Sequence, residues 1–589
     1  MKTVASCGVV LLLLLAGHVS ALQTSLPSNS SDKNFDGPAE LPREYVKSSL
    51  RDTPAPGKTL AVHAGQNLQE VLNRASCGDT VELEAGAVFT GSFVMPDKKC
   101  DDAHWIIVRT GAPDSALPAE GTRLTPCYAG VSSLPGRPVL DCRSTTNVLP
   151  KIVFNSKAGP SAIMFPAGAS HYRLIGLEVT RPESSGSVYN LILFKGGPAD
   201  HVVFDRLWVH GTAQDETTRG IFLGPSRFVA VVDSYFSDFH CIAKTGACVD
   251  AQAILGGIGD SPMGPYKIVN NFLEASTEVI LFGGGRAAAS PADIEVRRNH
   301  MFRPMSWKLG EPNFVGGRDG SPFIVKNVFE LKNAQRLLLE GNVLENSWGG
   351  FSQTGFAILL SPKNQNNLCP NCSVTDVTIR YNRVAHMGSG MQIANALSDA
   401  GGSVTDGGRY SIHDILFEDI GGQVYGGLGV FAQISTNIPP LHDLKLDHIT
   451  AFPPKFLFML GVRGAIPKIS NFVFTNNIVG TGTQLVLSTG GGPDNCAFQP
   501  GRQGLVGVLK SCFTSFTVEH NLVVGESDSW PKGNTTVKNL KAVGFVAAEK
   551  DSVSDYHLRP DSTAKHAGTD NKDLGVDFSA LSTAIDGVQ

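Results

Sequence analysis

The chain contains 589 residues, of which 42% are hydrophobic and 64 are glycine, and its formal net charge is −5. Lysine and arginine are interspersed with aspartate and glutamate, so we expect neither a nucleic-acid partner nor a polybasic membrane anchor. The apolar content supplies a large core, and the glycine content suits many short strands joined by tight turns.

The first 21 residues have the pattern of a signal peptide. Lys2 is followed by an apolar run over residues 9–16 and by the small-residue sequence Val19-Ser20-Ala21. The run is too short to span a bilayer, and no later segment is apolar for long enough to do so. We therefore expect a secreted protein, either extracellular or periplasmic.

The cysteines agree with export. Ten cysteines follow Cys7, and an even number in an oxidising compartment indicates disulfides. Pairing of neighbours in the sequence gives Cys77–Cys100, Cys127–Cys142, Cys241–Cys248, Cys369–Cys372 and Cys496–Cys512. The sequence alone leaves other connectivities open.

The N-terminal part changes character near residue 58. Residues 22–57 are rich in serine, proline and charge, which predicts a flexible leader. Apolar residues then follow helical spacing at Leu68, Val71, Leu72 and Ala75, and strand-like alternation over 81–85. We predict that 58–160 forms an N-terminal cap and the first coils, with the helix covering the open end of a stack of coils.

A short apolar strand that ends in asparagine recurs along the middle of the chain. The asparagines are Asn271, Asn299, Asn342, Asn382, Asn477 and Asn521, and a second class of apolar strand lies between them. Because hairpin signals and long helical periods are missing between these strands, the repeat predicts stacked parallel coils over 161–530. We expect the asparagines to be scaffold residues that bond to the turns. Residues 531–589 lose the pattern and are predicted to be a C-terminal tail or cap.

The repeat and the preceding helix resemble the pectin-lyase-like superfamily. Segments 278–284, 297–300, 326–336 and 341–345 are most similar to uncharacterised secreted bacterial β-helix repeat proteins. The resemblance implies an all-β fold, a right-handed parallel β-helix with an N-terminal capping helix, and a carbohydrate-active function. The polygalacturonase signatures do not occur here in their usual order, so the resemblance names no reaction.

Stacked coils bring polar residues from distant parts of the sequence together. Equivalent strand positions lie about 4.8 Å apart in neighbouring coils, so outward residues form columns along which an extended polysaccharide can lie. The most polar part of the repeat contains Asp250, Gln252, Glu278, Lys326, Glu330, Lys332 and Arg336. Alternation with Phe329 and Leu331 predicts that Glu330 and Lys332 face outward.

We predict a polysaccharide lyase that acts on an acidic polysaccharide by β-elimination in a groove along the helix. This chemistry needs a base, an acid and a group that neutralises the uronate carboxylate. The predicted catalytic residues are Lys332, Arg336 and Glu330, with Lys332 or Arg336 as the base. The predicted substrate-binding residues are Gln252, Lys326, Arg298 and Trp307. Asp250 and Glu278 are candidates to hold Ca²⁺, an ion that prefers several oxygen ligands.

Two other functions remain open. A glycoside hydrolase would use paired carboxylates, for which Asp250, Glu278 and Glu330 are the candidates. A non-catalytic polysaccharide-binding or adhesive β-helix would need no such cluster, and Glu330 and Lys332 would then form an exposed ion pair that contributes little. The sequence does not determine the sugar or the oligomeric state.

Overall fold

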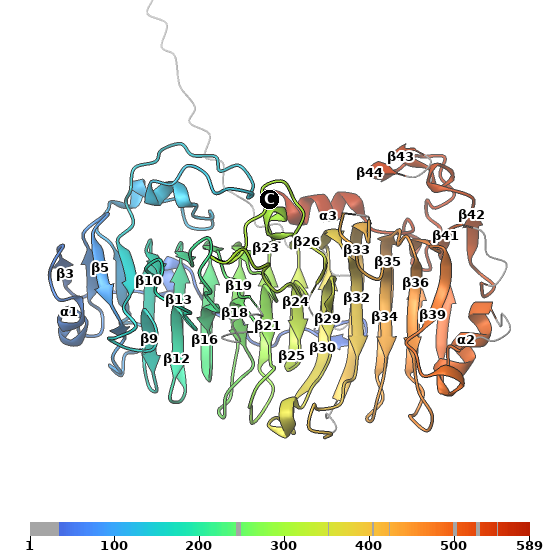
Figure 1. Cartoon of the computed structure of the whole chain (residues 1–589), viewed down its shortest axis with the longest axis horizontal. Helices are drawn as coiled ribbons and strands as arrows, with labels where there is room; N and C mark the ends of the chain where they lie inside the picture. The colour runs from blue at the N-terminus through green and yellow to red at the C-terminus, as the bar shows by residue number, and fades with distance from the viewer. Residues whose placement is uncertain are drawn as a thin grey trace, which may run out of the picture.

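The computed structural model describes residues 34–242, 249–350, 353–402, 406–422, 424–498, 504–525, 530–549 and 552–589. Strands dominate it, and Figure 1 shows them side by side along one long axis, in chain order from blue to red. Every strand pair within the two largest sheets is parallel and joins successive coils. The predicted all-β parallel β-helix is therefore confirmed by the strand pairing itself.

The strands form three stacks. Stack 1 contains β3 (Thr59–Val62), β4 (Thr80–Leu83), β7 (Ile106–Thr110), β10 (Ser170–Ile175), β13 (Ala199–Asp205), β16 (Ser226–Val232), β19 (Tyr266–Val269), β22 (Ala292–Arg297), β25 (Ala334–Glu340), β30 (Ser373–Arg380), β33 (Asp406–Ile420), β35 (His442–Ala451), β37 (Ser470–Thr475) and β40 (Phe516–Glu519).

Stack 2 follows stack 1 in each coil. It contains β5 (Val88–Gly91), β8 (Lys151–Phe154), β11 (Glu178–Thr180), β14 (Trp208–His210), β17 (Tyr235–Ser237), β20 (Phe272–Glu274), β23 (His300–Phe302), β26 (Val343–Ser347), β31 (Arg383–Met387), β38 (Ile478–Gly480), β41 (Leu522–Val524) and β42 (Thr535–Val537). The long strands β33 and β35 continue from stack 1 into stack 2.

Stack 3 completes each coil. It contains β6 (Phe93–Val94), β9 (Ile163–Pro166), β12 (Ile192–Lys195), β15 (Arg219–Phe222), β18 (Gln252–Gly256), β21 (Ile280–Phe282), β24 (Phe329–Leu331), β29 (Phe356–Leu360), β32 (Ser389–Ala394), β34 (Val430–Ser435), β36 (Phe456–Gly461) and β39 (Gln484–Ser488). The sequence indicated two strand types per coil rather than three, because strands such as β20 and β23 have only three residues and follow the asparagine turn directly.

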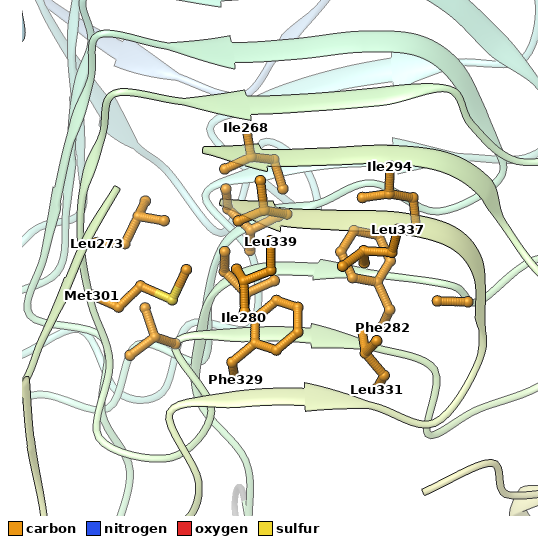
Figure 2. Packing of buried hydrophobic residues seen from close by; sticks show 14 of the residues in the cluster. Ile268, Leu273, Ile280, Phe282, Ile294, Met301, Phe329, Leu331, Leu337 and Leu339 are labelled. Atoms are coloured by element: carbon orange, nitrogen blue, oxygen red, sulfur yellow. The ribbon is translucent and has the colours of Figure 1, made fainter. Parts of the chain in front are cut away.

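The core fills the space that the three stacks enclose. Figure 2 shows Ile280 and Phe329 from stack 3 facing Leu273 and Met301 from stack 2 and Leu339 from stack 1. Ile280 pairs in register with Phe329, and both side chains are fully buried. Each coil therefore places its apolar residues on those of the next coil, and burial of this apolar area drives folding.

An asparagine ladder holds the corner between stacks 1 and 2. The side-chain amide of Asn271 donates to Oδ1 of Asn299 at 3.0 Å, Asn299 donates to Asn342 at 3.0 Å, and Asn342 donates to Asn382 at 2.9 Å. A second run joins Asn477 to Asn521 at 2.8 Å. All of these amides are buried and also bond to the backbone, so the predicted scaffold role is confirmed.

Residues with a left-handed backbone conformation form two further columns at the corners of the coils. Nine residues with φ between 48° and 64° lie at the start of stack 1: His171, His201, Phe228, Asp293, Arg336, Asp376, Arg409, Asp443 and Asn471. A second column, just before the asparagine ladder, includes Arg206, Asp233, Asn270 and Arg298. These backbone conformations turn the side chains out of the strand and toward the same positions in neighbouring coils.

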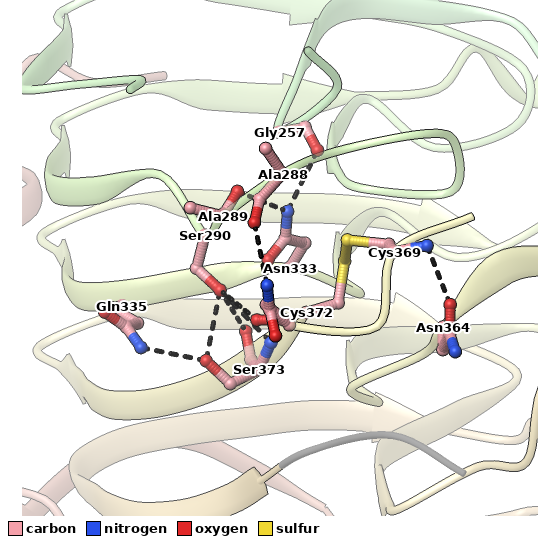
Figure 3. The surroundings of a disulfide bond; sticks show 11 residues. Gly257, Ala288, Ala289, Ser290, Asn333, Gln335, Asn364, Cys369, Cys372 and Ser373 are labelled. Carbon is pink, nitrogen blue, oxygen red and sulfur yellow. Dashed lines mark hydrogen bonds between the residues drawn. A yellow bond between two sulfur atoms is a disulfide. The ribbon is translucent and has the colours of Figure 1, made fainter. Parts of the chain in front are cut away.

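Four disulfides agree with the predicted pairs. They are Cys77–Cys100, Cys127–Cys142, Cys369–Cys372 and Cys496–Cys512. Figure 3 shows how polar contacts fix the Cys369–Cys372 loop: the backbone N–H of Cys369 donates to Asn364 Oδ1 at 2.7 Å, and Ser290 accepts from the N–H of Ser373 at 3.1 Å. The predicted pair Cys241–Cys248 includes Cys248, which lies outside the described residues.

The N-terminal segment differs from the prediction. Helix α1 (Leu68–Arg74) forms where the spacing indicated and packs against β3 and β6. A flexible leader is wrong for residues 34–57, which contain β1 (Phe35–Asp36), β2 (Ala39–Glu40) and the 3-10 helix η1 (Leu50–Asp52) and lie across stack 1. Residues 1–33, with the predicted signal peptide, lie outside the described part of the chain.

The C-terminal segment folds back against the outer face of stack 2. Leu574 and Leu581 pack with Leu416 and Ile478 in one buried cluster. The segment includes β43 (Phe545–Ala548), the antiparallel strand β44 (Val553–Leu558) and α3 (Phe578–Ile585), and α2 (Gly504–Cys512) lies earlier in the chain.

Short elements outside the stacks are η2 (Asp114–Ala116), η3 (Pro126–Ala129), η5 (Met305–Trp307), β27 (Gly349–Gly350), β28 (Gln353–Thr354), η6 (Gln365–Asn367), η7 (Gly492–Asp494) and η8 (Leu540–Val543). Within the described ranges, no helix has the length and apolar character needed to cross a membrane.

We predict that Asn342→Ala destabilises the protein strongly. The substitution leaves the backbone N–H and one side-chain N–H of Asn299 without their buried acceptor, at a cost of about 1–3 kcal/mol for each unpaired group, and it removes one of the two donors to Asn382 Oδ1. Chemical denaturation followed by circular dichroism measures the loss. The control is Asn313→Ala at an exposed loop position, which should leave stability unchanged. Equal stability of the two variants would show that the ladder is dispensable.

Candidate active site

A polar column runs along the turn that precedes stack 3. Arg219 pairs with Gln252 across two coils. Since Ile254 pairs with Ile280, the residue beside Gln252 in the next coil is Glu278. The register places residues that are far apart in the sequence in adjacent coils, as the sequence predicted for Gln252 and Glu278.

Hydrogen bonds connect this column from coil to coil. The Gln252 side chain accepts from Arg219 Nε at 3.2 Å and donates to Glu278 Oε2 at 2.8 Å. In the following coil, Asn327 Nδ2 donates to Glu330 Oε2 at 2.6 Å. Arg219 and Asn327 were not predicted, although their position in the same strand class as Gln252 was a signal that could have identified them.

Three carboxylates and two lysines meet at this column. Lys326 Nζ contacts the Asp250 carboxylate and lies 3.7 Å from Glu278 Oε1. Lys332 Nζ lies 2.8 Å from Glu330 Oε1. We call Asp250, Glu278 and Glu330 the carboxylate cluster. The structure therefore brings together six predicted site residues: Asp250, Gln252, Glu278, Lys326, Glu330 and Lys332.

The members of the carboxylate cluster differ in burial. The side chains of Glu278 and Glu330 are 1% and 3% exposed, whereas that of Asp250 is 36% exposed. Glu330 faces outward in register with Leu281, as the alternation predicted, but Lys332 and Asn327 cover it. Asp250 is therefore the carboxylate most accessible to a bound ligand.

Burial raises the pKa of Glu278 to about 7, and the nearby Asp250 carboxylate adds to the effect. Lys326 and Lys332 oppose this rise without cancelling it. A carboxyl group in this state exchanges its proton near neutral pH, which is the property that a general acid needs.

The two lysines, in contrast to Glu278, do not exchange their protons near neutral pH. Burial lowers the pKa of Lys332, but the carboxylates of Glu330 and Glu278 more than offset it, so that the pKa is raised overall. Lys326 is likewise raised, by Glu278 and Asp250. Both amines therefore keep their protons at neutral pH, and Lys332 is unsuited to act as the base that the sequence analysis assigned to it.

Arg303 holds the backbone that leads into the site. It is fully buried and donates to the backbone carbonyls of Ala275 at 3.2 Å and Thr277 at 2.5 Å. Burial lowers the pKa of Arg303 to about 9, and the carboxylates of Glu278 and Glu274 oppose this change. These bonds fix the turn that carries Glu278. This role has no signature in the sequence, because an arginine bonded to backbone carbonyls leaves no motif.

Three predicted site residues lie elsewhere. Arg336 belongs to the left-handed column of stack 1, where its Nε donates to Asp293 at 2.8 Å. Arg298 binds the carbonyls of Ala584 and Asp586 in the C-terminal segment. Trp307 is 1% exposed in a separate apolar cluster. The structure therefore does not bring the predicted catalytic residue Arg336, or the predicted substrate-binding residues Arg298 and Trp307, to the carboxylate cluster.

The residues present do not fit the expected Ca²⁺ site. The Lys326 ammonium contacts Asp250 and lies close to Glu278, so a cationic group already lies beside the two proposed ligands. Glu278 is also hydrogen-bonded to an amide N–H of Gln252. Ca²⁺ takes six to eight oxygen ligands, whereas this pair offers few oxygens that are not already bonded.

An open cavity of about 860 Å³ adjoins the column on the N-terminal side. Arg219 lines it and bonds to Gln252, which in turn bonds to Glu278, so two linked side chains connect the cavity to the carboxylate cluster. Phe222, beneath the Arg219 guanidinium at 5.9 Å, and the exposed Tyr189 supply flat apolar surfaces. The basic residues of the lining are Lys195, Arg219 and Arg286, and its one acidic residue is Asp260.

Comparisons with known proteins give no assignment. No family model and no curated protein matches the chain. Among solved structures, the pectate lyase Pel9A aligns over 89% of this chain and 97% of its own, with 11% identity and a TM-score of 0.37. The catalytic domain of a GH87 alpha-1,3-glucanase aligns over 81% and 70%, with 9% identity and a TM-score of 0.42.

A third neighbour is a mannuronic acid specific polysaccharide family 6 lyase from human gut microbiota, which aligns over 82% of this chain and 91% of its own with 10% identity and a TM-score of 0.43. Likenesses this low carry no argument about activity. The fold established by strand pairing is consistent with the resemblance to the pectin-lyase-like superfamily, and the function has to be argued from the site.

We predict that Glu278→Gln removes a pH dependence of stability. Because the folded pKa of about 7 exceeds the ordinary value of 4.5, the stabilising effect of the proton is complete below pH 4.5 and is lost as the pH rises through 7. Wild type should lose about 2–3 kcal/mol over this interval relative to the variant. Urea denaturation at a series of pH values measures the difference.

The matched control is Glu183→Gln, at a side chain that is 81% exposed. It should show the same pH dependence as wild type. A Glu278→Gln profile parallel to wild type would mean that Glu278 titrates normally.

Proposed function

We propose that the chain is a secreted enzyme that cleaves an acidic polysaccharide by hydrolysis in a groove along stack 3. The observation that carries this proposal is the carboxyl group of Glu278, whose pKa of about 7 stands out within a cluster of three carboxylates. Glycoside hydrolysis needs one carboxylic acid that protonates the leaving oxygen and one carboxylate that acts on the other side of the bond. We assign the first role to Glu278.

Asp250 is the candidate for the second role. It is the most exposed of the three carboxylates, whereas both oxygens of Glu330 are engaged by Lys332 and Asn327. We assign Glu330 to positioning Lys332 and to the negative field that raises the pKa of Glu278. The Lys326 ammonium group lies between Asp250 and Glu278. A negatively charged substrate that binds this ammonium group would release both carboxyl groups from it.

The same site gives less support to β-elimination. That reaction needs a base for the C5 proton, and both lysines of the site have raised pKa values that keep them protonated. Arginine is not a practical base, and Arg336 lies on another stack. Hydrolysis uses the carboxyl groups in the states that their surroundings favour.

The cavity lining supports an acidic substrate, and the disulfides support secretion. The cavity beside the cluster carries three basic side chains against one aspartate, which favours a negatively charged sugar. Tyr189 and Phe222 offer faces for sugar rings. Four disulfides suit an oxidising compartment and therefore agree with the expected secretion.

We predict that the purified protein releases new reducing ends from at least one acidic polysaccharide in a panel of pectins, alginates and related polyuronates. The products should lack the ultraviolet absorbance of unsaturated sugars, since no double bond forms in hydrolysis. Absorbing products would contradict hydrolysis and indicate elimination. Binding in affinity electrophoresis without any product would instead indicate a non-catalytic polysaccharide-binding protein.

The variant Glu278→Gln should lower kcat by about 10²–10⁴-fold, the usual contribution of a general acid. The wild-type rate should fall as the pH rises through about 7, because Glu278 then loses its proton. Glu295→Gln, a buried glutamate of stack 1, serves as the control and should keep its activity. Lys332→Ala distinguishes the mechanisms, since a lysine base would make this variant inactive, whereas hydrolysis allows residual turnover.

A further inference from the structure

Two histidines and an aspartate meet on a face that the proposed function does not use. His171 in β10 and His201 in β13 occupy the same place in successive coils, in the left-handed column at the start of stack 1. Asp102 comes from the loop between β6 and β7. One ligand atom from each of the three residues lies within 4.8 Å of the others. His171 Nε2 and Asp102 Oδ1 are already in contact at 3.2 Å.

The surroundings of His201 resemble the outer shell of a metal centre. Asp200 accepts from His201 Nδ1 at 2.9 Å, an arrangement that leaves the lone pair of Nε2 available. In the described part of the chain, no side chain or carbonyl bonds to His201 Nε2. Trp105 packs edge-on against both rings and shields one side of the group.

His171 provides a second, independent indication. It is only 8% exposed, and its Nδ1 has no hydrogen-bond partner within the residues that the structure describes. A buried imidazole with an unpaired nitrogen loses free energy relative to one in water.

We propose that Asp102, His171 and His201 bind a divalent transition metal ion, with Zn²⁺ as the best fit. Two imidazole nitrogens, one carboxylate oxygen and a water molecule form a tetrahedral set that this ion accepts. The mixed N and O ligands and the small number of oxygens disfavour Ca²⁺ and Mg²⁺. The site is separate from the carboxylate cluster, because it lies on stack 1 rather than on stack 3.

Binding requires a modest closure of the three side chains. Tetrahedral Zn²⁺ with bonds of about 2.0–2.1 Å holds its ligand atoms roughly 3.4 Å apart, closer than the limit of 4.8 Å found here. The imidazole rings are parallel and 4.6 Å apart, so one ring must turn to point its lone pair at the ion. The Asp102 side chain is 86% exposed and has room to move toward the ion, whereas the His201 ring, 30% exposed and stacked between His171 and Phe228, must tilt out of these contacts.

The test titrates Zn²⁺ into the chelator-treated full-length protein by calorimetry. Wild type should bind one equivalent more than Asp102→Asn and than His201→Ala, and both variants change partly exposed residues and should fold normally by circular dichroism. Asp200→Asn should keep the site but weaken it by roughly 10–100-fold, since it removes the partner that orients His201. Co²⁺ bound at the site should give the strong visible absorption of tetrahedral coordination in wild type and not in His201→Ala.

The control is His104→Ala, a half-exposed histidine near Asp102 that is not one of the three ligands. It should bind Zn²⁺ as wild type does. Equal stoichiometry and affinity in wild type, Asp102→Asn and His201→Ala would overturn the proposal, because the ion would then bind at other histidines. An unchanged Co²⁺ spectrum in His201→Ala would overturn it as well.

Discussion

The parallel register between successive coils is the constraint on which the rest of this structure depends. Gln252 and Glu278 can bond only because Ile254 pairs with Ile280, and a slip of one residue would turn the inward side chains outward. The asparagine ladder fixes this register at one corner. An amide both donates and accepts, so each asparagine satisfies the next without a change of residue type, which a carboxylate or a hydroxyl could not do with the same geometry.

The register also explains the charge state of the carboxylate cluster. Burial of an unpaired charge costs several kcal/mol, and the two lysine ammonium groups in contact with the cluster cannot compensate three carboxylates completely. Lys332 is in contact with Glu330 and Lys326 with Asp250, which leaves Glu278 with the weaker contact at 3.7 Å. At pH values below about 7, a proton on Glu278 removes the excess negative charge. A stack that concentrates like charges thus creates an acid without a dedicated motif.

Much of the fold and part of the site could be predicted from the sequence. The strand repeat identified the parallel coils, the asparagines identified the scaffold column, and proximity in the sequence identified the four described disulfide pairs. Alternation around Phe329 oriented Glu330 correctly. The state of Glu278 could not be predicted, because its pKa depends on Asp250 and Lys326 from other coils and on burial, none of which has a local signal.

Two of the three predicted site residues that lie away from the carboxylate cluster are at the corners of the coils. Arg336 and Arg298 have positive φ values, so they leave the strand direction that a pattern of alternation assumes and point at neighbours in the corner columns. A sequence pattern gives the period of a strand but not the place where one residue adopts the left-handed conformation, because arginine has no special preference for it.

The N-terminal segment could be misjudged for a related reason. A segment rich in serine, proline and charge has too little apolar surface of its own to fold in isolation, so its composition predicts disorder. Residues 34–57 are instead ordered by bonds to side chains that stack 1 already holds in place. The backbone N–H of Arg43 donates to Asp293 at 2.9 Å, and Asp36 accepts from Arg380 at 2.6 Å. Burial lowers the pKa of His413, but Asp36 and Asp414 raise it to about 9 overall, so the contact with Asp36 is an ion pair at neutral pH. The regular columns that the coils create thus bind a segment whose composition alone would leave it unfolded.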